Sequence, residues 1–216
     1  MQTTNQQYWN EALKRYTSKD WVDKPTIFAE QITSYLPKTG SLLELASGQG
    51  QDARYFARLG YKVTATDLVE TGLKEAQQKA EKENLHIVFQ TADLAQPLAF
   101  ADASFDIVYS HLGLHYLDKI GTAKMFKEIH RVLKPGGILA ALFNTIDDPE
   151  IHSVGFEKVE DNYYREIAFD FKKRYFSVED TRHFLDGLFN PLLLDNNGET
   201  YKDEIKTLIR LVARKI

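Results

Sequence analysis

Short apolar runs alternate with longer amphipathic stretches through the first two thirds of the chain. The apolar runs predict strands, which lie at residues 41–47, 62–67, 86–93, 105–110 and 137–143. Between them, apolar residues recur every three to four positions and predict helices at residues 52–59, 70–83 and 119–133. Pro135, Gly136 and Gly137 predict a break between the last of these helices and the last strand. Strands that alternate with helices are typical of a parallel sheet with helical crossovers.

The last third of the chain loses this regularity. Residues 147–170 are rich in aromatic and charged side chains without a clean period, so we expect a covering segment or lid there rather than a sheet element. A helix is expected at residues 178–188, because Ser177 followed three positions later by Asp180 approximates a capping box.

The C-terminal end predicts a pair of strands. Residues 191–194 and 207–213 are apolar and flank Asn196, Asn197 and Gly198, which form a strong turn signal. The residues between this signal and the second strand make the hairpin longer than the tightest kind. The fold class predicted is therefore α/β: a Rossmann-like doubly wound sheet of about seven strands, mostly parallel, with an antiparallel C-terminal edge hairpin.

A length of 216 residues favours one domain over two. We divide this single domain into an N-terminal helical cap (residues 1–40), a cofactor-binding core (41–145), a lid (146–176) and a C-terminal helix with strands (177–216). We expect a monomer or a homodimer.

Composition removes several classes of function. The formal net charge of −4 offers no basic excess to gather phosphate groups, so nucleic acid is not an expected partner. With no cysteine, thiolate nucleophiles, disulfides and cysteine metal sites are excluded. No apolar run approaches the roughly 20 residues of a membrane helix, and the N-terminus does not read as a secretory signal. We therefore expect no membrane partner and a cytoplasmic location.

A glycine-containing turn follows the first predicted strand. Its residues, Glu44-Leu45-Ala46-Ser47-Gly48-Gln49-Gly50, directly precede a helix, whose free N–H groups and dipole face a ligand bound there. Asp67 ends the second strand, where its carboxylate can accept both hydroxyls of a ribose. Together these features predict a nucleoside-containing cofactor. The alternative is a turn that serves only packing and an aspartate that caps the next helix.

The same turn also fits a nicotinamide cofactor. Residues 48–53 match the pattern G-x-G-x-x-G/A, with an acidic residue at nearly the expected distance. Glu44 argues against this reading, because a dinucleotide would bring a pyrophosphate close to its carboxylate, whereas a cofactor with an amino-acid end tolerates acid there. Glu44 can alternatively cap a helix or neutralise a buried arginine or lysine.

The series ELASGQG, TATD, TADL, FADASFDIVYSHLGLHYLD and FKEIHRVLKPGG resembles the class I S-adenosylmethionine-dependent methyltransferases in order and spacing, over residues 41–143. The C-terminal TYKDEIKTLIRLVARK looks like the small-molecule branch that includes tellurite-resistance and thiopurine-type methyltransferases. The resemblance implies methyl transfer from S-adenosyl-L-methionine to a small-molecule acceptor, with S-adenosyl-L-homocysteine as product. A non-catalytic S-adenosylmethionine-binding protein and an NAD(P)-dependent oxidoreductase are the alternatives.

The resemblance also implies which residues contact the cofactor. They come from four strand ends and are Glu44, Ala46, Ser47, Gly48, Gly50, Asp67, Leu68, Asp93, Leu94, Ser110 and His111. Asp67 would hold the ribose, Asp93 and Leu94 the adenine, and Ser110 and His111 would lie beside the methionine portion. Ala46 departs from the family pattern, which has glycine at this position.

His111 and His115 follow the fourth strand and are the candidate catalytic residues, as general bases for an acceptor that must lose a proton. The alternative for His115 is packing. Their i, i+4 spacing also fits metal ligands, but no carboxylate-rich cluster completes such a site, so no metal is expected.

Acceptor recognition is expected outside the cofactor motifs. The candidates are Tyr16, His115, Tyr163, Tyr164 and Arg165. Tyr16 belongs to an N-terminal aromatic group, with Tyr8, Trp9 and Trp21, that could form a helical flap over the cofactor or simply dock an N-terminal helix. The run Lys172-Lys173-Arg174 predicts a solvated face, or alternatively a basic lid for an anionic acceptor.

Overall fold

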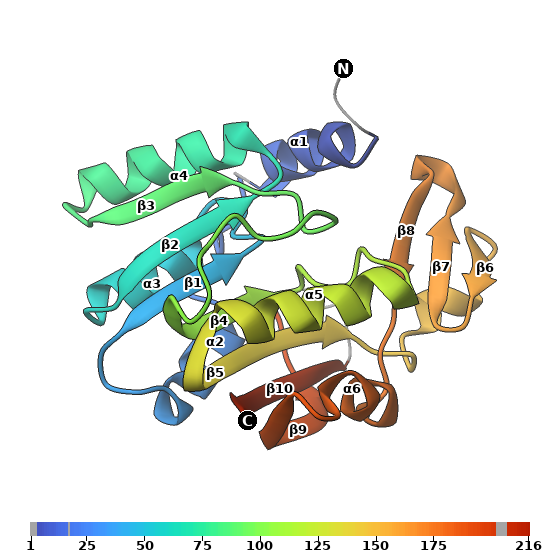
Figure 1. Ribbon diagram of the computed structural model, residues 1–216. Helices are drawn as coiled ribbons and strands as arrows, with labels where there is room; N and C mark the ends of the chain where they lie inside the picture. Colours follow the sequence, from blue (N-terminus) through green and yellow to red (C-terminus); the bar gives the residue numbers. More distant parts are fainter. Residues whose placement is uncertain (1–3, 17, 202–206) are drawn as a thin grey trace.

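The computed structural model describes residues 4–16, 18–201 and 207–216 (Figure 1). The helices are α1 (Thr4–Tyr16), α2 (Ile27–Ile32), α3 (Gln51–Arg58), α4 (Glu70–Lys82), α5 (Lys119–Val132) and α6 (Val178–Leu185), with short 3-10 turns η1 (Thr33–Tyr35), η2 (Pro149–His152) and η3 (Ile167–Phe169). The strands are β1 (Ser41–Leu45), β2 (Lys62–Asp67), β3 (Ile87–Thr91), β4 (Phe105–His111), β5 (Leu133–Asn144), β6 (Phe156–Glu160), β7 (Tyr163–Glu166), β8 (Phe171–Arg174), β9 (Phe189–Gly198) and β10 (Leu208–Lys215). None of the helices in this part of the chain is long and apolar enough to span a bilayer.

Seven of the described strands form one sheet in the order β3-β2-β1-β4-β5-β10-β9. β1 to β5 pair in parallel, and β10 pairs antiparallel with both β5 and β9. The predicted fold class is thereby confirmed. The strand order reverses between β1 and β4, and in a doubly wound sheet ligands bind beyond the carboxyl ends of the strands at such a point.

The sheet separates two hydrophobic clusters, and its strands alternate between them. In β5, Leu139, Ala141 and Phe143 pack into the cluster that contains α5 and α6, and the residues between them pack into the cluster that contains α2 and α3. This two-residue period follows from the strand geometry, in which successive side chains point to opposite faces. Both faces of the central strands are therefore covered by helices.

The fifth strand begins earlier than predicted. β5 starts at Leu133, which pairs with Phe105, and regular pairing resumes at Ile138, which pairs with Ile107. The predicted break is therefore a bulge within the strand. Gly136, at φ +74°, supplies the left-handed backbone conformation that the bulge requires.

The expectation that residues 147–170 are not a sheet element is wrong. β6 and β7 from this segment pair antiparallel, and β8 completes a second, three-stranded sheet that stands apart from the main sheet at the right of Figure 1. Four of the five residues of β6 are exposed, so this strand is held mainly by backbone hydrogen bonds. A strand that buries so few side chains leaves no two-residue apolar period in the sequence.

The C-terminal hairpin also differs from its prediction. Asn196, Asn197 and Gly198 belong to β9 and do not form the turn. The pairing register shifts here, because Gly198 faces Leu208 whereas Asp195 faces Arg210, so the turn-forming residues accommodate an irregularity in the strand. Most of the residues that connect β9 to β10 lie outside the described part of the chain. The helix α6 starts as predicted, with the Ser177 hydroxyl accepting the Asp180 N–H at 2.9 Å, and ends three residues early.

Candidate active site

A cavity of about 450 Å³ lies at the carboxyl ends of the central strands. The turn after β1, the ends of β2 and β4, and the segment after β3 form one part of its lining, and side chains of α1, η2 and β8 form the other. The volume is within the range of pockets that bind small molecules and cofactors. Four strand ends thus converge on one site, as the sequence predicts.

Asp67 anchors the glycine-containing turn. Its Oδ2 accepts the Gly48 N–H at 2.8 Å, and its Oδ1 accepts the Val69 N–H at 2.9 Å. Burial raises the pKa of the Asp67 carboxyl, and hydrogen bonds from the Val69 and Gly48 backbones offset part of this effect. A third backbone hydrogen bond comes from Leu68, and the side chain lines the cavity, so the carboxylate has room for a further donor there.

Glu44 lines the cavity from the end of β1 and is 3% exposed. Its Oε2 has no hydrogen-bond partner, while a hydrogen bond from the Ala53 backbone reaches the carboxyl group from the first turn of α3. Burial raises the pKa of Glu44 well above its ordinary value, and the carboxylates of Asp52 and Asp67 raise it further. The site therefore favours a bound cation that would restore the charged form of this carboxylate.

Ala46 adopts a left-handed backbone conformation, with φ +58°. A Cβ built on Gly113 would lie 2.5 Å from the Ala46 Cβ, so only a residue without a side chain fits opposite Ala46. The methyl group that departs from the family pattern is thus accommodated by a glycine from the segment after β4.

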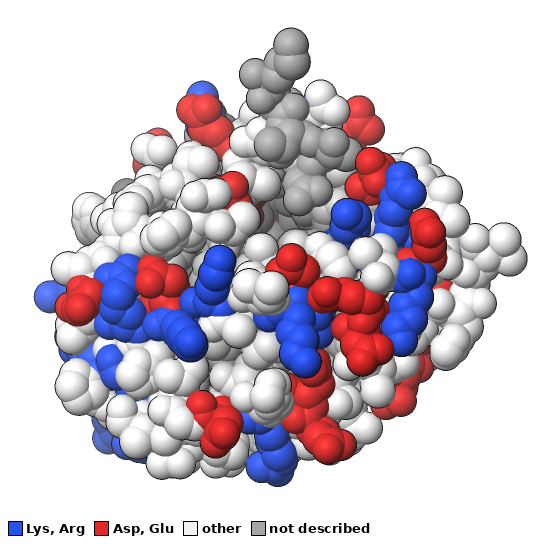
Figure 2. Space-filling view, turned by 45° about the vertical axis from the view of Figure 1, so that its right-hand side comes forward, with Lys and Arg blue, Asp and Glu red and all other residues white. Residues whose placement is uncertain are grey.

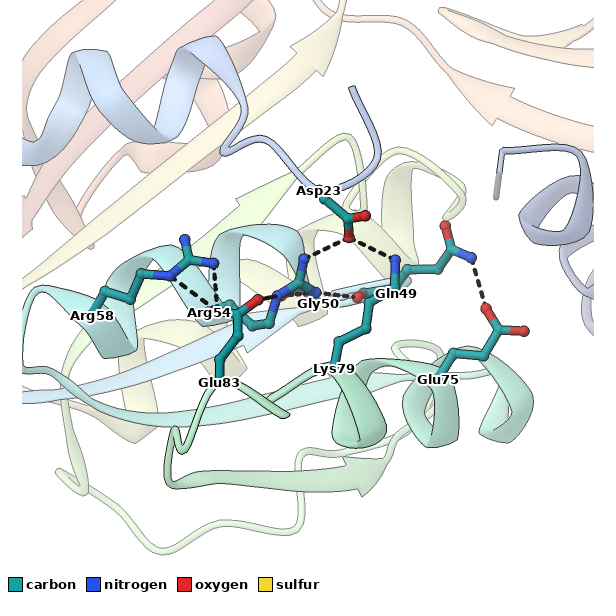
Figure 3. A network of polar contacts seen from close by, with 8 residues as sticks. All are labelled: Asp23, Gln49, Gly50, Arg54, Arg58, Glu75, Lys79 and Glu83. Atoms are coloured by element: carbon teal, nitrogen blue, oxygen red, sulfur yellow. Dashed lines mark hydrogen bonds and ion pairs between the residues drawn. The ribbon is translucent and has the colours of Figure 1, made fainter. Parts of the chain in front are cut away.

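Arg54 in α3 stabilises the glycine-containing turn by hydrogen bonds (Figure 3). It is 1% exposed, and its guanidinium donates to the backbone oxygens of Gln49 at 3.1 Å and Gly50 at 3.4 Å. The same group forms ion pairs with Asp23 at 2.8 Å and with Glu83 at 3.0 Å. Two segments distant in the sequence, those of Asp23 and Glu83, are thereby linked to the turn through Arg54. The ion pairs of this buried arginine are thus with Asp23 and Glu83, and its charge also lowers the pKa of Glu44.

Asp52 is a cavity residue that the sequence does not reveal. It is 2% exposed and accepts the Thr26 N–H at 2.7 Å, the Thr26 hydroxyl at 2.8 Å and the Tyr109 hydroxyl at 2.7 Å. Burial, followed by the Asp52 charge, raises the pKa of Tyr109 well above its ordinary value. Thr26 lies 26 positions away and Tyr109 lies 57, so no local motif contains this cluster.

The remaining predicted cofactor residues fall into two groups. Leu68, Asp93 and Leu94 line the cavity with Ser47 and His111, and the Asp93 Oδ1 accepts the Ala95 N–H at 2.9 Å. Gly50 and Ser110 lie outside the lining. The Gly50 conformation, with φ +69°, starts α3, and the Ser110 hydroxyl donates to the Leu45 carbonyl at 3.0 Å. These two residues shape the strand ends rather than face the cavity.

Aromatic side chains from distant segments meet in the second part of the cavity. The Tyr8 and Phe171 rings stack with centroids 4.6 Å apart, and Tyr116 lies 5.0 Å from Phe171 and 5.5 Å from Trp9. Tyr16 and Trp21 also line the cavity. The N-terminal aromatic residues therefore contribute to the cavity lining, which fits both a flap and a docked N-terminal helix.

Both candidate histidines line the cavity. His115 is 2% exposed, its ring centroid lies 4.2 Å from that of Tyr116, and its carbonyl accepts the Arg174 N–H at 2.7 Å. Across the described residues, no three histidine, aspartate or glutamate side chains gather as metal ligands.

Tyr163, Tyr164 and Arg165 lie in β7 and do not line the cavity, in contrast to their expected role in acceptor binding. Arg165 instead pairs with Asp170 at 2.6 Å, and the Tyr164 ring packs edge-on against Tyr175. The neighbouring strand β8 supplies the lining residues from this sheet. Phe171 and Lys173 are two positions apart, so the two-residue alternation of a strand would predict that both point to the same face.

The expectation of a solvated Lys172-Lys173-Arg174 face is wrong for two of its residues. Arg174 is 1% exposed and pairs with Glu160 at 2.9 Å. Lys173 points into the cavity lining and pairs with Glu150 at 3.0 Å. Lys172 remains exposed.

Comparisons with known proteins find a similar domain in the core of the chain. Residues 43–141 match the family model described as a methyltransferase domain. A malonyl-[acyl-carrier protein] O-methyltransferase of Pseudescherichia vulneris is 34% identical over 118 residues, which cover 53% of this chain and 43% of that protein. The chain spans about half the length of the curated relatives it matches.

Solved structures show the same fold. A 1,6-didemethyltoxoflavin-N1-methyltransferase of Burkholderia thailandensis, solved with 1,6-didemethyltoxoflavin and S-adenosylhomocysteine, has a TM-score of 0.75 at 18% identity, covering 97% of this chain and 84% of that chain. TehB from Haemophilus influenzae has a TM-score of 0.65 at 21% identity, covering 88% of this chain and 61% of that chain.

Proposed function

We propose that the chain is a class I S-adenosylmethionine-dependent methyltransferase and that it transfers a methyl group to a small-molecule acceptor, because residues 43–141 match the methyltransferase domain model. One similar protein is named for O-methylation and another for N1-methylation, so these names leave the acceptor atom of this chain open. The observation that carries the proposal is the buried Glu44 side chain, which lines the same cavity as Asp67 and has one carboxyl oxygen without a hydrogen-bond partner.

The residues of the cavity fit this cofactor. An α-ammonium group beside Glu44 would give its Oε2 a partner and would compensate the charges of Asp52 and Asp67, which now raise the pKa of Glu44. Ser47 offers a second unpartnered and buried oxygen in the lining. Asp67 can accept a ribose hydroxyl, because backbone N–H groups of Val69, Gly48 and Leu68 use three of the roughly four acceptor positions of its carboxylate.

A nicotinamide dinucleotide fits the same residues less well. Its pyrophosphate would lie near the turn after β1, where Glu44 and Asp52 bring two buried carboxyl groups. Among the described lining residues, the one lysine or arginine is Lys173, which comes from β8 and not from this turn. Burying like charges together is strongly unfavourable.

The chain's own part in the reaction is to bind, orient and exclude water. When bound, S-adenosylmethionine supplies an activated methyl group on its sulfonium. The acceptor must approach in line with the sulfur–carbon bond, so the wall formed by Tyr8, Trp9, Tyr116 and Phe171 would position it and keep solvent out. His111 and His115 line the cavity and are the proposed proton acceptors for an acceptor that must be deprotonated.

The proposal is tested by calorimetric titration with S-adenosylmethionine, S-adenosylhomocysteine and NADH in parallel, followed by an acceptor screen that detects methyl transfer. Binding of the first two ligands without NADH, together with turnover on an acceptor, is the expected result. Binding of NADH alone would contradict the proposal in favour of an oxidoreductase. Cofactor binding with no turnover on any acceptor would favour a non-catalytic binding protein. The cytoplasmic location and the oligomeric state stay predictions.

A further inference from the structure

The lining of the cavity is rich in carboxyl groups. On the face shown in Figure 2, basic and acidic side chains are interspersed. Among the described residues that line the cavity, Lys173 is the one lysine or arginine. The carboxyl groups there belong to Glu44, Asp52, Asp67, Asp93, Asp148 and Glu150. The cavity therefore favours positively charged ligands.

The cofactor accounts for only part of this charge. S-adenosylmethionine carries a sulfonium, an ammonium and a carboxylate, which leave one net positive charge. Glu44, Asp67 and Asp93 lie at the strand ends that would hold it, and the third of these carboxylates is exposed. Asp148 and Glu150 come from a different segment, in and before η2, and are not needed for this cofactor.

Lys173 does not offer a free positive charge to an acceptor. Its ammonium lies 3.0 Å from Glu150 and 3.7 Å from Glu166, and its side chain is 14% exposed. The next residue, Arg174, pairs with Glu160 and does not line the cavity. An anionic acceptor would have to displace these ion pairs, at the cost of leaving carboxylates without partners.

Asp148 has capacity for a further donor. Its Oδ1 accepts the Glu150 N–H at 3.0 Å, and the side chain is half-buried in the lining. Burial raises the pKa of Asp148 and the nearby Glu150 charge adds to this effect, while the Glu150 N–H and the Lys173 charge offset part of it. A cation bound beside Asp148 would relieve both penalties.

The aromatic wall suits the same kind of ligand. Tyr8, Trp9, Tyr116 and Phe171 line the cavity with Asp148 and bring the π-systems of four rings to this part of it. A cation that reaches the face of such a ring gains electrostatic attraction, which is larger where water is excluded.

We propose that the methyl acceptor is a small molecule that carries a protonated amine, held with its ammonium beside Asp148 and its apolar part against the aromatic wall. This assignment rests on the proposed function of the same cavity. It replaces the expectation of a basic lid that recruits an anionic acceptor.

The test uses the protein saturated with S-adenosylhomocysteine and two probes of similar size and opposite charge, phenethylamine and 3-phenylpropionate. Calorimetry should show the amine binding at least about tenfold more tightly than the carboxylate. Asp148→Asn should remove most of this preference. Asp147→Asn removes an adjacent charge from a residue that does not line the cavity, and it should preserve the preference.

The Lys173→Gln variant further distinguishes a cationic acceptor from an anionic one. Removing this ammonium should leave amine binding at least as tight, because Glu150 is released, whereas an anion site would lose affinity. Equal or tighter binding of 3-phenylpropionate, or binding of neither probe to protein that binds S-adenosylhomocysteine, would overturn the inference. Failure to bind S-adenosylhomocysteine would instead refute the proposed function, and the inference with it.

Discussion

The contact between Ala46 and Gly113 offers a test of how the cofactor turn tolerates a methyl group where the family has glycine. In a Gly113→Ala variant, the new Cβ would lie 2.5 Å from the Ala46 Cβ and 2.6 Å from the Ser110 Oγ. Carbon atoms in good contact are about 3.5–4.0 Å apart, so the overlap exceeds about 1 Å. Overpacking of this kind costs about 1–3 kcal/mol. We expect a loss near the upper end, because the Ser110 hydroxyl is held by the Leu45 carbonyl.

Ala46→Gly should behave differently. The left-handed conformation costs an alanine about 1–2 kcal/mol, and the greater entropy of glycine in the unfolded chain offsets about 0.5–1 kcal/mol of this. The variant should therefore be as stable as the native chain or slightly more stable. When Gly113→Ala is combined with Ala46→Gly, the new Cβ no longer meets the Ala46 Cβ. The free energy of unfolding lost through Gly113→Ala should then be smaller by about 1 kcal/mol.

Urea denaturation of the native chain, the two single variants and the double variant measures this coupling. Calorimetry with S-adenosylhomocysteine should show undiminished affinity for Ala46→Gly. Additive free energies of unfolding, within about 0.5 kcal/mol, would refute the argument that Gly113 accommodates Ala46.

Three further predictions concern the turn and its supports. Asp67→Asn should weaken S-adenosylhomocysteine binding at least about tenfold, since charge-assisted hydrogen bonds are worth about 1.5–3 kcal/mol each; unchanged affinity in a folded variant would contradict the assignment. The pKa of Glu44 in the folded protein is raised above its ordinary value of 4.5. The folded protein therefore gains stability from protonated Glu44 at pH values below 4.5, and it loses this stability as the pH rises through the folded-state pKa. Glu44→Gln should therefore stabilise the cofactor-free protein more at pH 8 than at pH 5 in denaturation experiments, and an equal effect at both would argue against this linkage. Arg54→Met should cost about 3–5 kcal/mol, because Glu83 and the turn carbonyls lose a buried donor, whereas the exposed Arg58→Met should cost about 1 kcal/mol or less; similar losses would show that burial is not decisive.

Local patterns in the sequence determine most of the core. β2 occupies the residues predicted for it, α4 and α5 end one residue before their predictions, and α3 begins and ends one residue before its prediction. Such elements can be predicted because their apolar periods and glycine breaks involve residues close in the chain. The turn after β1 and Asp67 belong to this class, because strand ends in a parallel sheet meet at one edge.

The acceptor side of the cavity was decided by the tertiary structure. β8 brings Phe171 and Lys173 into the lining, where the sequence suggested Tyr163, Tyr164 and Arg165 from the adjacent strand. The small sheet buries few side chains, so the hydrophobic pattern carries no information about its register.

The tertiary structure also decides how strongly the buried groups favour their charged or neutral forms. By itself the sequence determined that Glu44 ends a strand beside a glycine-containing turn and that Asp52 begins a helix. Only the folded chain removes Glu44 from water beside the charge of Asp52, and only it brings Thr26 to that aspartate and Glu150 to Lys173. Burial and charge proximity depend on contacts between residues far apart in the chain, whereas periodicity depends on near neighbours, so the sequence pattern could predict the sheet and the cofactor turn but not the charge balance of the cavity.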